Sequence, residues 1–140
     1  MKATLKTLKF PYGSAAVFIA LLLMCSQSAR AQAESVETQT AIFAGGCFWC
    51  IESDFEKLPG VLSVESGYTG GHVANPDYEQ VSGGKTGHIE SVRVNYDAAI
   101  ISYPALLDFF WHHIDPTVQN QQFCDKGNQY RSAIFYANDE

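Results

Sequence analysis

Residues 45 to 50, "GGCFWC", place two thiols three residues apart, at Cys47 and Cys50. Such a pair is typical of a redox-active site, of half a metal site, or of a structural disulfide. Two glycines precede Cys47, where a predicted strand hands over to a predicted helix, and they predict an open position. The free N–H groups of a helix start stabilise an anion there, which favours the nucleophilic thiolate. We therefore interpret Cys47 as a nucleophile, with an inert buried cysteine as the alternative.

Two other classes of site compete for this pair of cysteines. A structural zinc site needs four ligands, and only Cys124 and scattered histidines remain to complete one. A thioredoxin-like disulfide exchanger usually has small residues or proline between its cysteines, whereas this chain has Phe48 and Trp49. Phe48 fits the apolar face of the predicted helix and Trp49 does not. Trp49 is therefore the better candidate for lining a substrate pocket, although both rings could belong to the core.

Glu90 is the second unusual residue, because it stands on the apolar face of a predicted strand. In "IESVRVNY" it alternates in phase with Val92, Val94 and Tyr96. Desolvation raises the pKa of a carboxyl group, so Glu90 could keep its proton near neutral pH and donate it. The alternative is a wet carboxylate at a frayed strand end.

Three weaker candidates lie in predicted loops. Tyr78 and Tyr130 are phenols beside polar residues, where tyrosine more often packs than takes part in catalysis. Asp125 follows Cys124 and comes shortly before a glycine, which alone predicts a turn residue. A nucleophilic thiol, a proton donor and a spare thiol together suit the reduction of a polarised X–O bond. The sulfur attacks, the oxygen leaves protonated, and a second thiol captures the sulfenic acid as a disulfide.

The elements that must position these residues follow from apolar spacing and turn residues. The pattern predicts strands at 40–44, 61–68, 89–96 and 129–136, helices at 47–58 and 102–113, one helical turn at 78–81, and a loop at 117–128. Leu62, Val64 and Tyr68 are expected to share one face of the second strand. The order βαββαβ is that of the split βαβ motif. We therefore predict an α+β fold, a ferredoxin-like two-layer α/β sandwich.

The first 33 residues differ in character from this domain. A basic start is followed by an unbroken apolar run of 11 residues at 15–25, and small residues precede Ala31 and Ala33. This arrangement predicts a secretory signal peptide over 1–33, cleaved after Ala31 or Ala33, and an exported, periplasmic protein. A polar linker at 34–40 and a catalytic domain at 41–140 are expected to follow. An uncleaved anchor and a lipidated Cys25 are the alternatives.

Removal of the leader changes both the charge and the cysteine count. A chain cut after Ala31 has 5 basic and 15 acidic residues, a net charge of −10, which argues against nucleic acid as a partner. It keeps three cysteines, and an odd number favours a reactive thiol over a disulfide framework. In an oxidising compartment such a thiol needs a supply of electrons.

Five short motifs, in order, give the chain a family resemblance. From about residue 41 to 136 it resembles the peptide-methionine sulfoxide reductase A family in "GGCFWC", "SGYTGG", "NPDYEQV", "TGHIESVRVNYD" and "QYRSAI". The resemblance implies reduction of the S epimer of methionine sulfoxide, free or in proteins. It also implies electrons from thioredoxin or a similar donor, and no metal or bound cofactor.

The resemblance also implies a role for each candidate residue. Cys47 matches the nucleophile that attacks the sulfoxide sulfur, and Glu90 matches the acid that protonates the oxygen. Tyr78 and Tyr130 match two phenols that bind the oxygen, and Asp125 matches a carboxylate that orients the substrate. Phe48 and Trp49 match two rings that hold the methyl group.

Two departures from the family pattern affect the prediction. Many members have glycine in place of Cys50 and carry recycling thiols in a C-terminal tail, so Cys50 is our choice for the resolving thiol, with Cys124 as its competitor. Members also continue well past the fourth predicted strand with helices that cover the core, and we expect that extension to be missing here. The alternative to a reductase is therefore a truncated member of the family that binds without catalysing a reaction.

Overall fold

The computed structural model describes residues 37–136. Its elements in chain order are β1 (Thr38–Ala44), α2 (Phe48–Phe55), β2 (Val61–Thr69), α3 (Tyr78–Ser82), β3 (Ile89–Asp97), α4 (Tyr103–His112), β4 (Gln121–Gln122), β5 (Asp125–Lys126), the 3₁₀ helix η1 (Asn128–Tyr130) and β6 (Ala133–Phe135). The predicted signal peptide at 1–33 lies outside the described residues. The first strand starts at Thr38, so the last three residues of the predicted linker at 34–40 belong to it.

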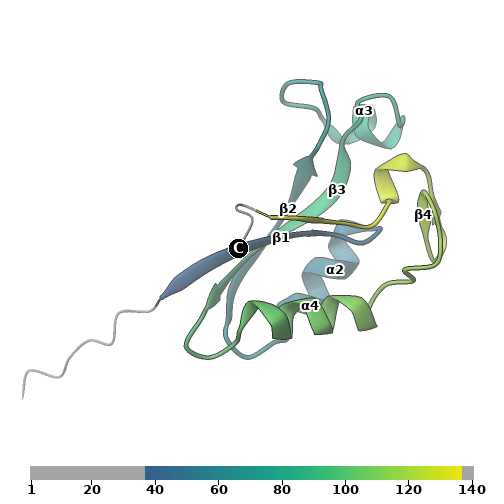
Figure 1. Cartoon of the computed structure of the whole chain (residues 1–140). Helices are drawn as coiled ribbons and strands as arrows, with labels where there is room; N and C mark the ends of the chain where they lie inside the picture. Colours follow the sequence, from purple (N-terminus) through teal and green to yellow (C-terminus); the bar gives the residue numbers. More distant parts are fainter. Residues whose placement is uncertain (1–36, 137–140) are drawn as a thin grey trace, which may run out of the picture. The chain divides into compact units, whose positions relative to one another are not determined.

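The main sheet has four antiparallel strands in the order β2-β3-β1-β6. Helices α2 and α4 pack against the same face of this sheet, and α3 stands at one end of it with the loop that follows β2 (Figure 1). This arrangement confirms the predicted α+β class and its ferredoxin-like two-layer form. Within residues 37–136, no helix combines the length and apolar character needed to span a membrane.

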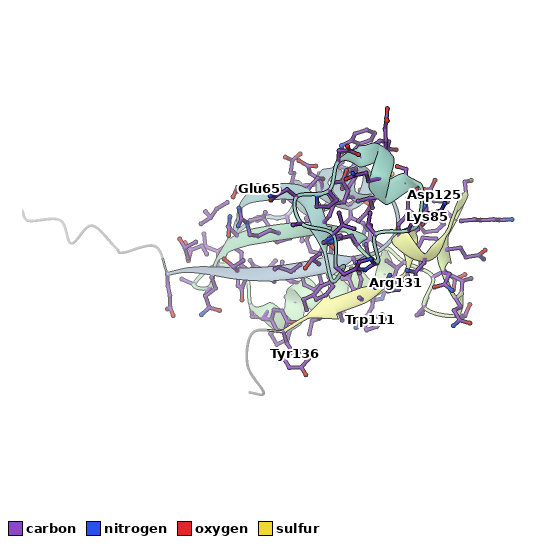
Figure 2. The ribbon with its side chains drawn as sticks, turned by 90° about the horizontal axis from the view of Figure 1, so that it is seen from above. Glu65, Lys85, Trp111, Asp125, Arg131 and Tyr136 are labelled. Carbon is purple, nitrogen blue, oxygen red and sulfur yellow. The ribbon has the colours of Figure 1, made fainter. Side chains whose placement is uncertain are left out.

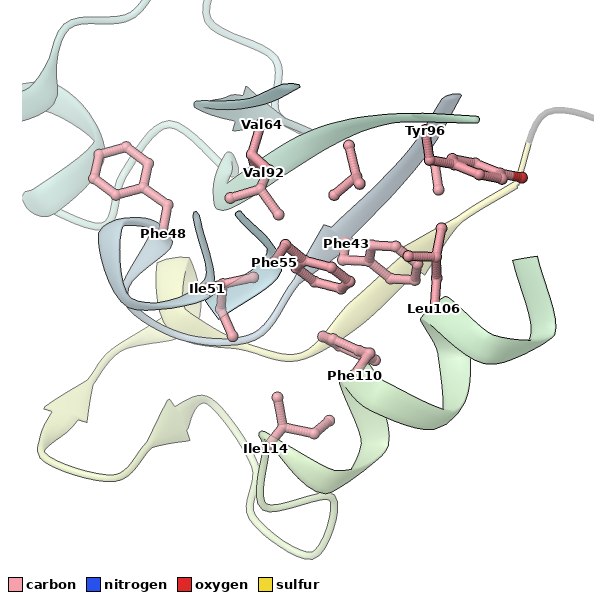
Figure 3. Close-up of a cluster of buried hydrophobic side chains, with 12 residues drawn as sticks. Phe43, Phe48, Ile51, Phe55, Val64, Val92, Tyr96, Leu106, Phe110 and Ile114 are labelled. Atoms are coloured by element: carbon pink, nitrogen blue, oxygen red, sulfur yellow. The ribbon is translucent and has the colours of Figure 1, made fainter. Parts of the chain in front are cut away.

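The core lies between the sheet and the two helices. Phe43 of β1 is fully buried, and its ring stacks on Phe55 at 5.0 Å and on Phe110 at 5.1 Å between centroids (Figure 3). Phe48, Ile51 and Phe55 form the buried side of α2, as their spacing predicts. Each such side chain contributes about 1.5–3 kcal/mol when fully buried. Because Phe48 belongs to this stripe, the core fixes the start of α2.

Helix α4 begins where its sequence predicts. The Ser102 Oγ accepts a hydrogen bond from the N–H of Ala105 at 3.3 Å, and Pro104 lies in the first turn. At the other end, the ring Nδ1 atoms of His112 and His113 each lie 2.7 Å from the carbonyl oxygen four residues earlier. The predicted bounds of this helix are therefore confirmed to within one residue at each end.

Leu62 does not share a face with Val64 and Tyr68. Val61 pairs with Tyr96 and Ser63 pairs with Asn95, so Leu62 is an extra residue in the ladder, a β-bulge. Its side chain is half exposed. The prediction was wrong because strict alternation assumes an unbroken ladder.

The end of the chain also differs from prediction. The predicted loop at 117–128 contains the β4–β5 hairpin, whose ends are tied by the Gly127 N–H bond to the Asn120 carbonyl at 2.8 Å. The predicted strand at 129–136 shortens to β6, which pairs with β1 at residues 42–44. The residues before β6 form η1 instead, and the Arg131 Nη1 donates to the Asn128 carbonyl at 2.9 Å there.

Candidate active site

Cys47 is the N-cap residue of α2 and stands just outside the helix. Its backbone is extended, with φ −58° and ψ 116°, and its carbonyl accepts from the N–H groups of Cys50 at 3.1 Å and Ile51 at 3.3 Å. The side chain is half-buried and the thiol is free. The thiol therefore stands where a strand ends and a helix begins, as predicted. The partial exposure of Cys47 argues against the alternative of a buried, inert cysteine.

The two glycines before Cys47 are themselves closely packed, although Cys47 is only half-buried. A Cβ on Gly45 would lie 2.8 Å from the Ile114 Cγ2, and a Cβ on Gly46 would lie 2.5 Å from the Gln122 Cβ. Gly46 also has φ +95°, which L side chains rarely adopt. Glycine is therefore needed here for close approach and for the turn, and the turn holds Cys47 in one place.

Glu90 is buried on β3, with 2% of its surface exposed. Its Oε2 accepts a hydrogen bond from the backbone N–H of Phe48 at 3.0 Å, which places the carboxyl group beside the start of α2. Burial raises the pKa of Glu90, the charge of Asp125 adds to that rise, and the Phe48 N–H opposes it. The frayed-strand alternative is wrong, and the carboxyl group next to Cys47 holds its proton to higher pH than an exposed glutamate.

Cys50 is exposed in the first turn of α2. Burial, then a hydrogen bond to Cys47, then the charges of Cys47, Asp125 and Asp54 raise the pKa of the Cys50 thiol. The two side chains are therefore neighbours across the helix boundary. The Cys50 thiol therefore holds its proton to higher pH than an ordinary exposed cysteine.

An aromatic cluster covers the start of α2. The Phe48 ring lies 5.3 Å from Trp49, 5.6 Å from Tyr68 and 6.4 Å from Tyr78 between centroids. Trp49 and Tyr78 are nearly parallel, at 6.0 Å and 10°. Phe48 is buried, whereas Trp49 is 62% exposed. Phe48 therefore serves both the core and this surface, and Trp49 forms an exposed wall, as the sequence predicts for it.

Tyr78 opens α3, whose start is fixed by a capping box. The Asp77 Oδ1 accepts from the Gln80 N–H at 2.8 Å, and the Gln80 Oε1 accepts from the Asp77 N–H at 3.0 Å. The predicted helical turn at 78–81 is therefore confirmed as the support of Tyr78.

Two phenols lie near the Glu90 carboxyl group. Burial and then the charge of Glu90 raise the pKa of Tyr68 and of Tyr130, and Tyr78 contributes to both rises. Tyr68 also pairs directly with Glu90 across β2 and β3. The sequence analysis assigned Tyr68 only to a strand face. Its signal is the register, because a tyrosine opposite a buried glutamate points into the same site.

Asp125 is the least regular part of the site. It begins β5 after a two-residue hairpin turn made of Phe123 and Cys124, both exposed. Figure 2 shows Asp125 at the hairpin end of the described residues, well away from Tyr136, which follows β6. The charge of Asp125 acts on Glu90, Cys50 and Tyr130. The structure therefore brings Asp125 to the site, with Cys124 beside it on the hairpin.

All the predicted site residues belong to this end of the molecule. Within residues 37–136, no group of three or more histidine, cysteine or acidic side chains is arranged to hold a metal ion. The arrangement can supply a thiol nucleophile, a proton donor beside it, a neighbouring thiol, and an aromatic surface with phenolic O–H donors. Those groups are the ones that a thiol-dependent reduction needs, and they stand together on an α+β fold.

Comparison with known proteins identifies the family. The model of peptide methionine sulfoxide reductase matches residues 39–140. MsrA of Limosilactobacillus reuteri is 57% identical over 101 residues, covering 72% of this chain and 58% of that protein. MsrA/MsrB of Vibrio cholerae is 59% identical over 106 residues, covering 76% and 28%. The structure of methionine sulfoxide reductase A of Corynebacterium diphtheriae superposes with a TM-score of 0.70 and 37% identity, covering 73% of this chain and 48% of that one.

This chain belongs to the peptide methionine sulfoxide reductase family. It spans 58% of the length of the L. reuteri relative and 28% of that of the V. cholerae relative.

Proposed function

We propose that the protein reduces methionine S-sulfoxide to methionine with its own thiols, and so repairs oxidised proteins. The observation that carries the proposal is the buried Glu90 carboxyl group, bound to the Phe48 N–H one residue from Cys47. A proton donor fixed beside a thiol is what reduction of an S–O bond needs. Membership of the family supports the same activity.

In the proposed reaction the Cys47 thiolate attacks the sulfoxide sulfur while Glu90 protonates the oxygen. The S–O bond and the new bond between the two sulfurs then break as the hydroxyl passes to the Cys47 sulfur, so methionine leaves and Cys47 becomes a sulfenic acid. The methyl group packs on Phe48 and Trp49, Tyr78 and Tyr130 donate to the oxygen, and Asp125 orients the polar end of the substrate. No bound cofactor or metal takes part.

The Cys50 thiol then attacks the sulfenic sulfur, which forms a disulfide and releases water. Cys50 lies in the first turn of the helix that Cys47 caps, and this proximity favours Cys50 over Cys124 as the resolving thiol. A dithiol protein of the thioredoxin type then reduces the disulfide. We also propose an exported, periplasmic protein, which the signal-peptide pattern predicted at 1–33 supports.

The test supplies S- and R-methionine sulfoxide separately, with dithiothreitol as reductant, and follows methionine formed. We expect turnover of the S form only, abolished by Cys47→Ser. Equal turnover of both forms, or activity that survives Cys47→Ser, would contradict the proposal. Reduction of protein disulfides in place of sulfoxides would favour the exchange enzyme.

The resolving thiol is tested without reductant. Wild-type protein and Cys124→Ser should form a disulfide after one turnover, and Cys50→Ser should stop at a sulfenic acid that dimedone traps. The reverse pattern would assign resolution to Cys124.

A further inference from the structure

Gln122, on β4, is buried with 1% of its surface exposed, and its amide group is fully engaged. The Oε1 accepts from the Asp115 N–H at 2.8 Å, and the Nε2 donates to the Asp115 carbonyl at 2.7 Å and to the Ser132 Oγ at 2.8 Å. One side chain therefore joins the chain after α4, the hairpin and the chain before β6. Loss of these bonds would leave buried polar groups unpaired.

The aliphatic stem of Gln122 touches the turn that carries the nucleophile. A Cβ on Gly46 would lie 2.5 Å from the Gln122 Cβ and 3.2 Å from its Cγ. The stem of Gln122 therefore fills the space that a side chain on Gly46 would need. Gly46 immediately precedes Cys47 and is buried. Any shift of the Gln122 stem therefore acts on the backbone next to the thiol.

The same residue is the hairpin partner of Asp125. The pair Gln122 and Asp125 is the innermost one of the β4–β5 ladder. The backbone that presents Asp125 to Glu90 and Cys50 is therefore fixed where Gln122 is fixed.

We propose that Gln122 is a positioning residue of the site, which holds the hairpin of Asp125 against the Gly46–Cys47 turn. It touches neither substrate nor reacting atoms, and acts through Asp125 and Cys47. The proposal rests on the proposed function and adds a residue to it. Misplacement of a catalytic group by about 1 Å lowers a rate by up to about 10²-fold.

The test compares Gln122→Met with Gln119→Met in the full chain. Methionine keeps the length of the stem and removes every hydrogen bond, while Gln119 is exposed three residues earlier. With thermal unfolding showing both variants folded, Gln122→Met should lower kcat/KM for S-methionine sulfoxide by about 10- to 100-fold, and Gln119→Met should not. Wild-type kcat/KM in a folded Gln122→Met would overturn the proposal.

A double variant separates positioning from general loosening. If Gln122 acts through Asp125, Gln122→Met should lower kcat/KM much less in an Asp125→Asn background than in the wild type. The alkaline limb of the pH profile of kcat/KM should shift in the same direction in Gln122→Met and in Asp125→Asn. Glu90, which sets that limb, is faced by Tyr68, Tyr130 and Asp125. Fully additive effects would overturn the proposal.

Ser132→Ala carries the test if Gln122→Met does not fold. It removes one of the three bonds and should lower kcat/KM by about three- to tenfold, and an unchanged value there would overturn the proposal.

Alkylation of Cys47 by iodoacetamide in a Cys50→Ser background keeps the proposal testable if the wild type reduces no sulfoxide. Its rate should change severalfold in Gln122→Met and not in Gln119→Met, and equal rates would contradict the positioning role.

Discussion

Cys47, Phe48 and Glu90 are held by regular structure, whereas Asp125 and Tyr130 stand on a segment with little of it. The first group, the framework half, lies at the start of α2 and on β3, and the Phe48 N–H bond to Glu90 joins the two elements. The second group, the loop half, follows α4 on a two-pair hairpin and a single 3₁₀ turn. Backbone ladders and the core fix the framework half, and side-chain hydrogen bonds such as those of Gln122 fix the loop half.

This difference predicts which property of the protein a single substitution in each half should change. A change in the framework half alters chemistry or the fold directly. A change in the loop half alters the position of groups around the reacting atoms. Its effects on kcat/KM should be smaller and should depend on pH and on neighbouring residues.

Replacement of the Glu90 carboxylic acid should have the largest effect on activity. Glu90→Gln keeps an acceptor for the Phe48 N–H and loses the acid, so kcat/KM should fall by about 10²–10⁴-fold. Stability should not fall with it. Burial raises the pKa of Glu90 in the folded chain, so wild-type stability decreases as pH rises through that pKa. The advantage of Glu90→Gln in urea unfolding should therefore grow with pH, and a less stable variant at high pH would contradict this.

Phe48→Ala and Trp49→Ala separate the core from the exposed wall. Phe48 is buried and Trp49 is 62% exposed. Phe48→Ala should lower the free energy of unfolding by about 3–5 kcal/mol, because it removes a ring from the core. Trp49→Ala should change it by less than about 0.5 kcal/mol and raise KM for the sulfoxide. Denaturant unfolding and steady-state kinetics measure both, and similar losses of stability would remove the distinction.

Asp125→Asn tests the link between the two halves. The charge of Asp125 raises the pKa of Glu90, so its removal should lower that pKa. The protonated acid is then lost at lower pH, and the alkaline limb of kcat/KM should shift downward. A limb that stays in place while the maximal rate falls would show that Asp125 acts on the substrate alone.

Asp77→Ala should have the smallest effect. It removes the capping box of α3 and should destabilise the protein by about 0.5–2 kcal/mol. Because the box fixes Tyr78, KM should rise modestly, and Asp77→Asn should restore most of the loss. Thermal unfolding with matched kinetics checks the pair.

The two halves also differ in how far the sequence predicts them. Apolar spacing predicted α2, β3 and the inward face of Glu90, because the core repeats at helix and strand periods there. The hairpin at 121–126 was missed, since Gln121 and Gln122 show no apolar alternation and their pairing depends on bonds to distant residues. Asp125 was assigned to the site through the family motif, and the structure shows how the hairpin brings it there. Tyr68 was missed as a site residue because strand register cannot be read from one strand.

The most direct test of the account is a single turnover without added reductant. Reduced protein is mixed with S-methionine sulfoxide, methionine is counted, and the protein is digested under conditions that preserve disulfides. We predict one methionine per chain and a new disulfide between Cys47 and Cys50, with neither product in Cys47→Ser. Methionine formed in Cys47→Ser, or none formed by a folded wild-type chain, would contradict it.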